Sequence, residues 1–185
     1  MSRMLVGVVF ALVLTSCSTQ VPGAPVTSSK PTTTSQLPTN ANGRVHITFD
    51  PCKDIPAAAI QQLQLDAKPP RSDTQSDGDI ENVFCKYYPR GEYLLTLAAS
   101  NYTLEMLRQS NNEWGYQDLE IGGRKALFGY RSVQPKTDSC ALNISASTGV
   151  YGVLISSSPG EFAPYPDCLT AARKNAEGLV PYLPL

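Results

Sequence analysis

The acidic stretch DTQSDGDIE, residues 73–81, carries side chains of the kind that a calcium loop uses. The residues that match part of the pattern D-x-[DN]-x-[DN]-G are Asp73, Asp77, Gly78 and Glu81. Gln75 occupies a ligand position of that pattern, and Phe84 stands where the bidentate glutamate belongs. Because two ligands are missing, we interpret residues 71–82 as a solvated acidic loop and predict no metal site.

Nucleophilic catalysis needs a serine, a cysteine or another nucleophile beside a base. The chain has one histidine, His46, and its serine run Ser156–Ser158 precedes Pro159 and Gly160, as expected for a strand that ends in a turn. The motifs G-x-S-x-G, S-x-x-K, G-x-G-x-x-G and the P-loop do not occur. We therefore predict no catalytic residues and no cofactor.

Acid–base chemistry by carboxylates stays open as an alternative. Asp118 and Glu120 have i, i+2 spacing, which places both side chains on one face of a strand. Such a pair is more often simply the solvated face of a strand.

Aromatic residues are the other candidates for a site, because the chain has nine tyrosines and one tryptophan. On strands, these rings could line a groove for a glycan or a peptide, or they could lie half buried with their hydroxyls at the rim. The residues concerned are Tyr87, Tyr88, Tyr93, Tyr102, Trp114, Tyr116, Tyr130, Tyr151 and Tyr165.

The N-terminus has the pattern of an export signal. Arg3 gives a short positive region, and residues 4–14 form an apolar run that is too short to span a bilayer. Leu14-Thr15-Ser16-Cys17 resembles the lipobox of bacterial lipoproteins, in which the peptidase cuts before the cysteine and the thiol receives a diacylglycerol. We predict a signal peptide over 1–16 and lipidation of Cys17. The alternative is an ordinary secretory signal with a chance cysteine.

Residues 17–43 contain few side chains that could enter a hydrophobic core. Ser, Thr, Pro, Asn and Gly dominate this stretch, which is typical of a disordered stalk. The lipidated cysteine and the stalk together predict a protein anchored to the extracytoplasmic face of the cell membrane. One globular domain is expected over 44–185.

The cysteine count supports the anchor. With Cys17 assigned to lipid, an even set remains: Cys52, Cys85, Cys140 and Cys168. In an oxidising compartment this set predicts two disulfides, for which three pairings exist. Cys52 and Cys168 each lie at a predicted helix start, where a disulfide to a strand would pin the helix. We therefore predict the pairs Cys52–Cys85 and Cys140–Cys168.

The pattern of the domain predicts an α+β fold, an antiparallel sheet of hairpins with two or three helices packed on one side and two disulfides. Asp54 and Asp167 are expected to cap the first and last helices. The expected strands are 45–49, 84–88, 93–99, 116–121, 125–130, 142–146 and 151–155, and the expected helices are 57–65, 103–113 and 167–176.

Several of these features occur together in a known family. The lipobox, the stalk, and the motifs FDPC, VFCKYY, IGGRKALFG and PDCLTAARKNAEGLVPYLP resemble actinobacterial cell-envelope lipoproteins, mycobacterial members most of all. The domain of that family has no established function, so the resemblance implies a location and a fold but no activity. The layout also resembles, more loosely, extracellular sensor domains of mycobacterial receptor kinases, which implies ligand binding.

The expected function is therefore that of a non-enzymatic binding, sensing or accessory module, held at the membrane by its diacylglycerol. Its partners would be an envelope glycan, a lipid or a protein; a net charge of −1 gives no attraction to nucleic acid. The alternatives are a hydrolase or transferase that uses carboxylates, and a lipid carrier. A concave pocket with a buried carboxylate would favour the enzyme, a tyrosine-lined groove the binding module, and a large apolar cavity between sheet and helices the carrier.

Overall fold

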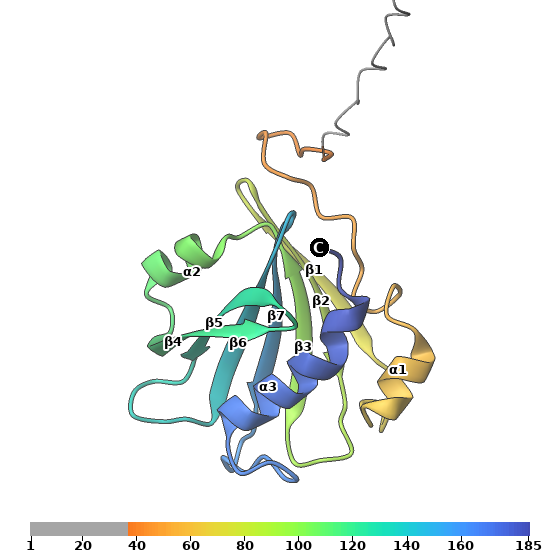
Figure 1. The fold of residues 1–185 in the computed structure, drawn as a ribbon, viewed down its shortest axis with the longest axis vertical. Coiled ribbons are helices and arrows are strands. Elements are labelled where there is room, and N and C mark those ends of the chain that lie inside the picture. The colour runs from red at the N-terminus through yellow and green to blue at the C-terminus, as the bar shows by residue number, and fades with distance from the viewer. Residues whose placement is uncertain (1–36) are drawn as a thin grey trace, which may run out of the picture. The chain divides into compact units, whose positions relative to one another are not determined.

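A single antiparallel sheet of seven strands forms the folded part of the molecule. The computed structural model describes residues 37–185. The predicted signal peptide, Cys17 and most of the predicted stalk lie outside the described residues. The strands are β1 Arg71–Asp77, β2 Ile80–Tyr87, β3 Leu94–Ser100, β4 Trp114–Ile121, β5 Arg124–Tyr130, β6 Ser139–Ala146 and β7 Gly149–Ser156. Their order across the sheet is β1-β2-β3-β7-β6-β5-β4 (Figure 1).

Helices lie on both faces of this sheet. Helix α3, Cys168–Leu179, runs across β6 and β7, and α1, Ala57–Gln62, packs into the same hydrophobic core (Figure 1). Helix α2, Leu104–Ser110, contacts β6 from the opposite face. A short 3-10 helix, Val180–Tyr182, follows α3. The α+β class is confirmed in outline, but the expectation that all helices pack on one side is wrong.

The core lies between the sheet and α3. Alternate strand residues such as Leu97, Leu142 and Val153 point to this face and are fully buried. Helix α3 presents the small side chains of Ala172 and Ala176, which allow the helix to approach the sheet closely.

Two disulfides connect the helical segments to the sheet, as the sequence predicts. Cys52, which lies in the turn before α1, is bonded to Cys85 in β2. Cys168, the first residue of α3, is bonded to Cys140 in β6. Each bond therefore joins a helix start to a strand.

The largest difference from the expected fold lies at residues 71–82. They were expected to form a loop, yet Arg71–Asp77 form β1, which pairs along its whole length with β2. Gly78 adopts a φ of +60°, which allows the tight turn between the strands. Every residue of β1 is exposed. A strand with water on both faces carries polar side chains throughout, so it lacks the alternation that reveals a strand in sequence.

Two smaller predictions also fail near the start of the domain. Residues 45–49 alternate as expected, with Ile47 and Phe49 buried, but they run along the sheet without joining it as a strand. Asp54 does not cap α1, because its carboxylate accepts a hydrogen bond from the backbone N–H of Asp50, and the helix begins after Pro56 instead. The fixed φ of proline suits the first turn of a helix without a side-chain cap.

Residues 40–44 belong to the fold. Asn40 Nδ2 donates to the carbonyl of Asp79, and Arg44 forms an ion pair of 2.7 Å with the carboxylate of Asp79. Residues 40–43, assigned from sequence to the stalk, therefore lie against the turn between β1 and β2. Within residues 37–185, no helix combines the length and the apolar character needed to cross a membrane.

Candidate functional site

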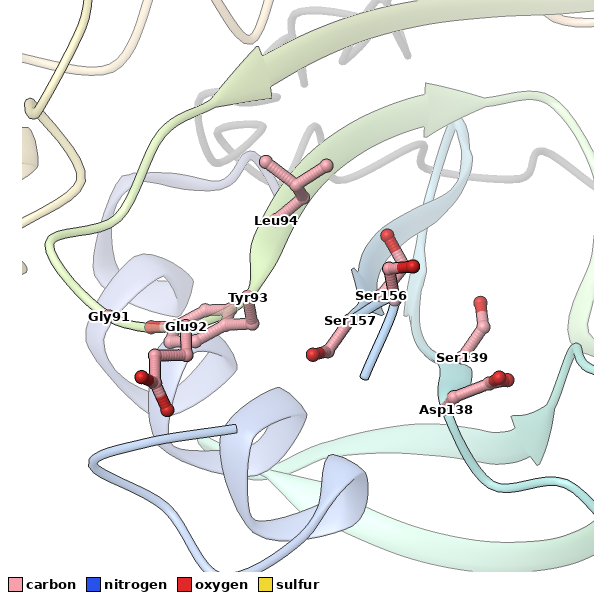
Figure 2. A pocket seen from close by; sticks show the side chains of 9 residues that line it. Gly91, Glu92, Tyr93, Leu94, Asp138, Ser139, Ser156 and Ser157 are labelled. Atoms are coloured by element: carbon pink, nitrogen blue, oxygen red, sulfur yellow. The ribbon is translucent and has the colours of Figure 1, made fainter. Parts of the chain in front are cut away.

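A hollow at one end of the sheet contains several serines (Figure 2). We call it the serine hollow. It has a volume of about 540 Å³, and its lining residues are Gly91, Glu92, Tyr93, Leu94, Asp138, Ser139, Ser156, Ser157 and Ser158. Figure 2 shows that Leu94 on β3, Ser156 on β7 and Ser139 on β6 border the same space.

The serine hollow has hydroxyls, and the carboxylates that line it belong to Glu92 and Asp138. The Asp138 carboxylate accepts a hydrogen bond from the Ser132 hydroxyl, and Ser157 Oγ accepts one from the backbone N–H of Glu161. His46 lies elsewhere, with its Nδ1 2.8 Å from the Glu81 carboxylate. Among the residues that line this hollow, no side chain could act as the histidine or lysine partner of a nucleophilic serine.

A second hollow lies on the sheet face opposite α3, and we call it the open-face cleft. It has a volume of about 300 Å³, at the lower end of the range for ligand sites. Its floor is formed by side chains that point away from the core. The lining residues are Gln75, Asp77, Ile80, Asn82, Phe84, Ala98, Ser100, Tyr102, Leu107, Asn112, Glu113, Arg131, Ala141, Asn143, Val150, Gly152 and Leu154.

Glu113 enters this cleft from the connection between α2 and β4. Asn111 ends α2 in the left-handed conformation, with φ of 52°, and so reverses the chain. The next residue after Glu113, Trp114, stacks on Tyr130 at 4.7 Å between ring centroids and donates from Nε1 to the carbonyl of Ser132. These contacts hold the backbone at Glu113 against β5.

The carboxylate of Glu113 lies in an environment that disfavours its charge. Its Oε2 is shielded from solvent and has no hydrogen-bond partner among residues 37–185. Burial raises the pKa of Glu113 to about 7, although the positive charge of Arg131, which also lines the cleft, opposes part of this rise. Glu113 is therefore a mixture of carboxylic acid and carboxylate near neutral pH.

Asn143 is the second polar group of the cleft floor. It lies in the middle of β6, opposite Gly152 of β7, and only 6% of its surface is exposed. Its Nδ2 is buried and finds no acceptor within the described part of the chain. Buried amides in folded proteins nearly always have partners, so an unpaired one at a cleft indicates a group that a ligand could satisfy.

Two glycines make room for these two side chains. A Cβ on Gly129 would lie 2.5 Å from Glu113 Oε2, and a Cβ on Gly152 would lie 2.8 Å from Asn143 Oδ1. Any larger residue at either position would displace the polar group from the cleft. Glu113 and Asn143 thus pack directly over two glycines of the sheet.

Helix α2 closes one side of the cleft. The Thr103 side chain accepts from the backbone N–H of Met106 and caps the helix, while Tyr116 donates its hydroxyl proton to the carbonyl of Leu107 at 3.3 Å. Arg108 forms an ion pair with Asp118 on β4. The helix is therefore fixed to β4 and holds Leu107 at the wall of the cleft.

Among the residues that the sequence proposed for chemistry, Asp77 and Tyr102 line the open-face cleft, whereas Asp118 and Glu120 do not. Asp118 is engaged with Arg108, and both Asp118 and Glu120 are exposed on edge strand β4. Of the listed aromatic residues, Tyr102 alone lines the open-face cleft, whereas Tyr87 and Tyr151 are buried in the opposite core. Two of the listed tyrosines, Tyr93 and Tyr165, line a separate hollow of about 390 Å³ beside Arg90, with their ring centroids 5.8 Å apart.

The acidic side chains of the calcium-loop pattern do not converge on one point in the structure. Asp73 and Asp77 lie on the exposed strand β1, and the Glu81 carboxylate accepts a hydrogen bond from the backbone N–H of Ile47. That bond lowers the pKa of Glu81, with a further contribution from His46. Over residues 37–185, no cluster of His, Cys, Asp and Glu side chains is arranged to hold a metal ion.

Sequence reasoning missed Glu113 and Asn143 for different reasons. In the sequence, Glu113 lies at the end of a predicted helix, where a charged residue usually faces solvent. The signal that could have revealed it is the neighbouring Trp114, the sole tryptophan, because a tryptophan is usually packed and holds the adjacent backbone in place. Asn143 alternates with Leu142 and Ile144 and so appeared to face water. It does point away from the core, but α2 and the neighbouring strands bury that face.

Comparison with known proteins identifies a family but no characterised relative. The search of curated proteins gave no match, and the search of solved structures gave none either. A family model described as "Protein of unknown function (DUF3558)" matches residues 12–182, which is nearly the whole chain. The chain therefore belongs to the DUF3558 family.

Proposed function

We propose that this protein is a membrane-anchored lipoprotein of the cell envelope whose domain binds a small ligand in the open-face cleft, without turning it over. The observation that carries the proposal is a concave cleft of about 300 Å³ whose lining includes both Glu113 and Asn143.

The composition of the cleft supports binding. Its floor is made of the small residues Ala98, Ala141 and Gly152, and its walls include apolar side chains such as Leu107 and Leu154. Polar side chains such as Asn82, Asn112 and Arg131 also line the cleft, so it offers hydrogen-bonding groups as well as apolar contacts. Sensing and accessory roles would both use such a site.

The proposal for the anchor is supported by the sequence. The apolar run over residues 4–14, Cys17 and the Ser/Thr/Pro-rich stretch behind it have the order found in bacterial lipoproteins. Two disulfides in the domain fit an oxidising compartment outside the cytoplasm. The resemblance to actinobacterial envelope lipoproteins supports the same location.

A hydrolase or transferase is the second candidate, and one observation favours it. Glu113 has a pKa of about 7 in a cleft, as a general acid requires. Asp77 lines the same cleft and is a second carboxylate. Recovery of the bound ligand after prolonged incubation separates the candidates, because a binding module returns it unchanged and an enzyme returns products.

The experiment that tests binding is a saturation-transfer NMR screen of a small-molecule library against the whole chain. Ala98→Leu places a large side chain on the cleft floor, while Thr96→Leu makes a comparable change on the same strand and face outside the cleft. We expect hits whose signals are lost with Ala98→Leu and kept with Thr96→Leu. Hits that survive Ala98→Leu, or a library with no hits, would overturn the proposal.

The anchor has its own test. In cells fed an alkyne-tagged fatty acid, we expect the wild-type chain to carry the tag and to partition into the detergent phase of Triton X-114. Cys17→Ala should lose both properties, while Cys17→Ser should behave like the alanine variant, because a hydroxyl does not form the thioether. A tagged Cys17→Ala chain would contradict the assignment.

A further inference from the structure

The sheet has two edges, and they are built differently. Strand β4 forms one edge, where a register shift between Trp114 and Gln117 breaks the regular pairing with β5. Irregular edges of this kind resist pairing with a further strand. Strand β1 forms the other edge, and its pairing with β2 continues without a shift from Arg71 to Asp77. The β1 edge is therefore the one that a further strand can extend.

The backbone groups of β1 point alternately toward β2 and away from it. The turn between the two strands is a two-residue turn, so the hairpin closes with the hydrogen-bonded pair Asp77 and Ile80. Hydrogen-bonded pairs then alternate along β1, which leaves the N–H and C=O groups of Ser72, Thr74 and Ser76 directed away from the sheet. Within residues 37–185, no strand pairs with this side of β1.

The sequence of β1, RSDTQSD, is complementary to itself when two copies run antiparallel about Thr74. In that register Thr74 lies opposite the second copy's Thr74, and Ser72 lies opposite its Ser76. Every outward-facing N–H and C=O group of the strand then has a backbone partner. Arg71 lies opposite the second copy's Asp77 at both ends, which gives two pairs of opposite charge. The same surface serves both copies, as a twofold axis requires.

Other registers bring like charges together. Because outward-facing groups must meet, the second copy can slide only in steps of two residues. One step in one direction places Asp73 opposite the second copy's Asp73, and one step in the other direction places it opposite Asp77. Like charges directly opposite each other destabilise a strand pair. The register centred on Thr74 avoids both contacts and uses the whole length of β1.

One contact within the chain opposes this pairing. The Asp73 carboxylate accepts a hydrogen bond of 2.9 Å from the backbone N–H of Thr74, which is one of the outward-facing donors. That bond must open before Thr74 can pair across the axis. Both residues are exposed, so water replaces the lost partner of Asp73 at little cost. A single pair of edge strands is also a small interface, so the association is weak and reversible, and a covalent trap is the suitable probe.

From these observations we propose that β1 is an interface at which two copies of this chain join their sheets edge to edge about a twofold axis at Thr74. The second copy also contributes to the open-face cleft. Asp77 lines that cleft, and residues opposite each other on paired strands share a face. The second copy's Arg71 therefore adds a positive charge at the margin of the cleft. This inference does not depend on the proposed ligand binding or on the lipid anchor.

Disulfide trapping tests the pairing in the whole chain. Every variant also carries Cys17→Ser, so that the introduced cysteine is the sole thiol outside the two disulfides. Under mild oxidation with copper–phenanthroline, Thr74→Cys should form a covalent dimer. Hydrogen-bonded pairs on antiparallel strands have Cα atoms about 5.5 Å apart, which is within the range of a disulfide.

Two further variants test the register. Two copies of Ser72 lie about 14 Å apart along the paired strands, too far for a disulfide. Ser72→Cys alone should therefore dimerise about tenfold more slowly than Thr74→Cys. Ser72→Cys mixed with Ser76→Cys should form the mixed dimer as readily as Thr74→Cys forms its own. Labelling one of the two chains with ¹⁵N lets mass spectrometry distinguish the mixed dimer.

Charge exchange tests the contacts at the ends of the strand. In Thr74→Cys, the added change Arg71→Asp places two acidic side chains opposite each other and should lower the trapped fraction severalfold. Adding Asp77→Arg to that variant restores opposite charges and should restore trapping. Lys136→Asp makes the same change of charge at an exposed position outside β1 and is the control. All of these positions are exposed, so thermal unfolding should show a fold as stable as the wild type.

Three outcomes would overturn the inference. Thr74→Cys could stay monomeric, or it could form dimers no faster than Ser72→Cys, which would indicate random collision. In cells it could be trapped on a different protein and not on its own copy, which would assign the β1 edge to another partner. None of these results bears on ligand binding in the open-face cleft, so the proposed function would stand or fall by its own test.

Discussion

Glu113 and Gly129 are packed so closely that a methyl group on Gly129 would lie 2.5 Å from Glu113 Oε2 and 2.8 Å from Glu113 Cβ. Gly129 lies on β5, and Glu113 lies in the connection from α2 to β4. The carboxyl group therefore occupies the volume that a side chain on β5 would fill. This contact holds Glu113 at the edge of the open-face cleft.

The first prediction concerns Gly129→Ala. The added methyl group must displace Glu113, and overpacking of this kind costs about 1–3 kcal/mol. Urea unfolding should show this loss in the single variant. In Glu113→Ala/Gly129→Ala the nearest contact is gone, so the double variant should lose less than the sum of the two single variants. Additive losses would show that the two residues do not meet.

The second prediction concerns pH. The pKa of Glu113 rises from 4.5 to about 7 on folding. Between these values the folded chain binds more protons at Glu113 than the unfolded chain. The free energy of unfolding therefore falls as the pH rises from about 4.5 to about 7, and above that range Glu113 causes no further change. Glu113→Gln should melt several degrees above the wild type at pH 8 and at nearly the same temperature at pH 4.5. An equal difference at both pH values would contradict the assignment.

The third prediction concerns Asn101, which is 3% exposed and lies just after β3. Its Oδ1 accepts from the backbone N–H of Glu81, and its Nδ2 donates to the carbonyls of Val45 and Asp79. Asn101→Ala removes hydrogen bonds to three partly buried backbone groups, of which the Asp79 carbonyl keeps Asn40 as a donor, so it should cost about 1–3 kcal/mol in chemical unfolding. Asn42→Ala, an exposed position with one bond to Gly78, is the control and should change stability by less than about 0.5 kcal/mol.

The fourth prediction concerns the disulfides. They join residues that are 33 and 28 positions apart in the sequence. Loops of this length give about 3–4 kcal/mol each in the chain-entropy model. Cys52→Ala/Cys85→Ala and Cys140→Ala/Cys168→Ala should therefore lose similar amounts of stability. Peptide mapping without reduction checks the pairing directly, and a peptide that joins Cys52 to Cys168 would refute it.

The sequence predicts the hairpins well because their signals are local. Gly122 and Gly123 separate two alternating runs, and both adopt positive φ in the turn between β4 and β5. Asp167 caps α3 by accepting from the backbone N–H of Thr170, as its position before an alternating apolar face indicates. In each case the residues that decide the structure are neighbours in the chain.

The open-face cleft could not be predicted in the same way, because its parts meet only through the sheet. Glu113 and Asn143 lie 30 positions apart, and Gly152 comes from a third element. The environment of Asn143 depends on α2, which covers the face opposite the other helices. Strand β1 was missed for a related reason, since the backbone of β2 stabilises it without any help from apolar side chains.

The most direct test of the proposed function is a ¹H–¹⁵N NMR titration of the whole chain with the compounds found in the library screen. Binding in the open-face cleft predicts that the side-chain amide signals of Asn143, and the backbone signals of Ala98 and Gly152, shift together and saturate with a single dissociation constant. Shifts confined to Gly91–Leu94 and Ser156–Ser158 would place the ligand in the serine hollow instead. That result would contradict the account.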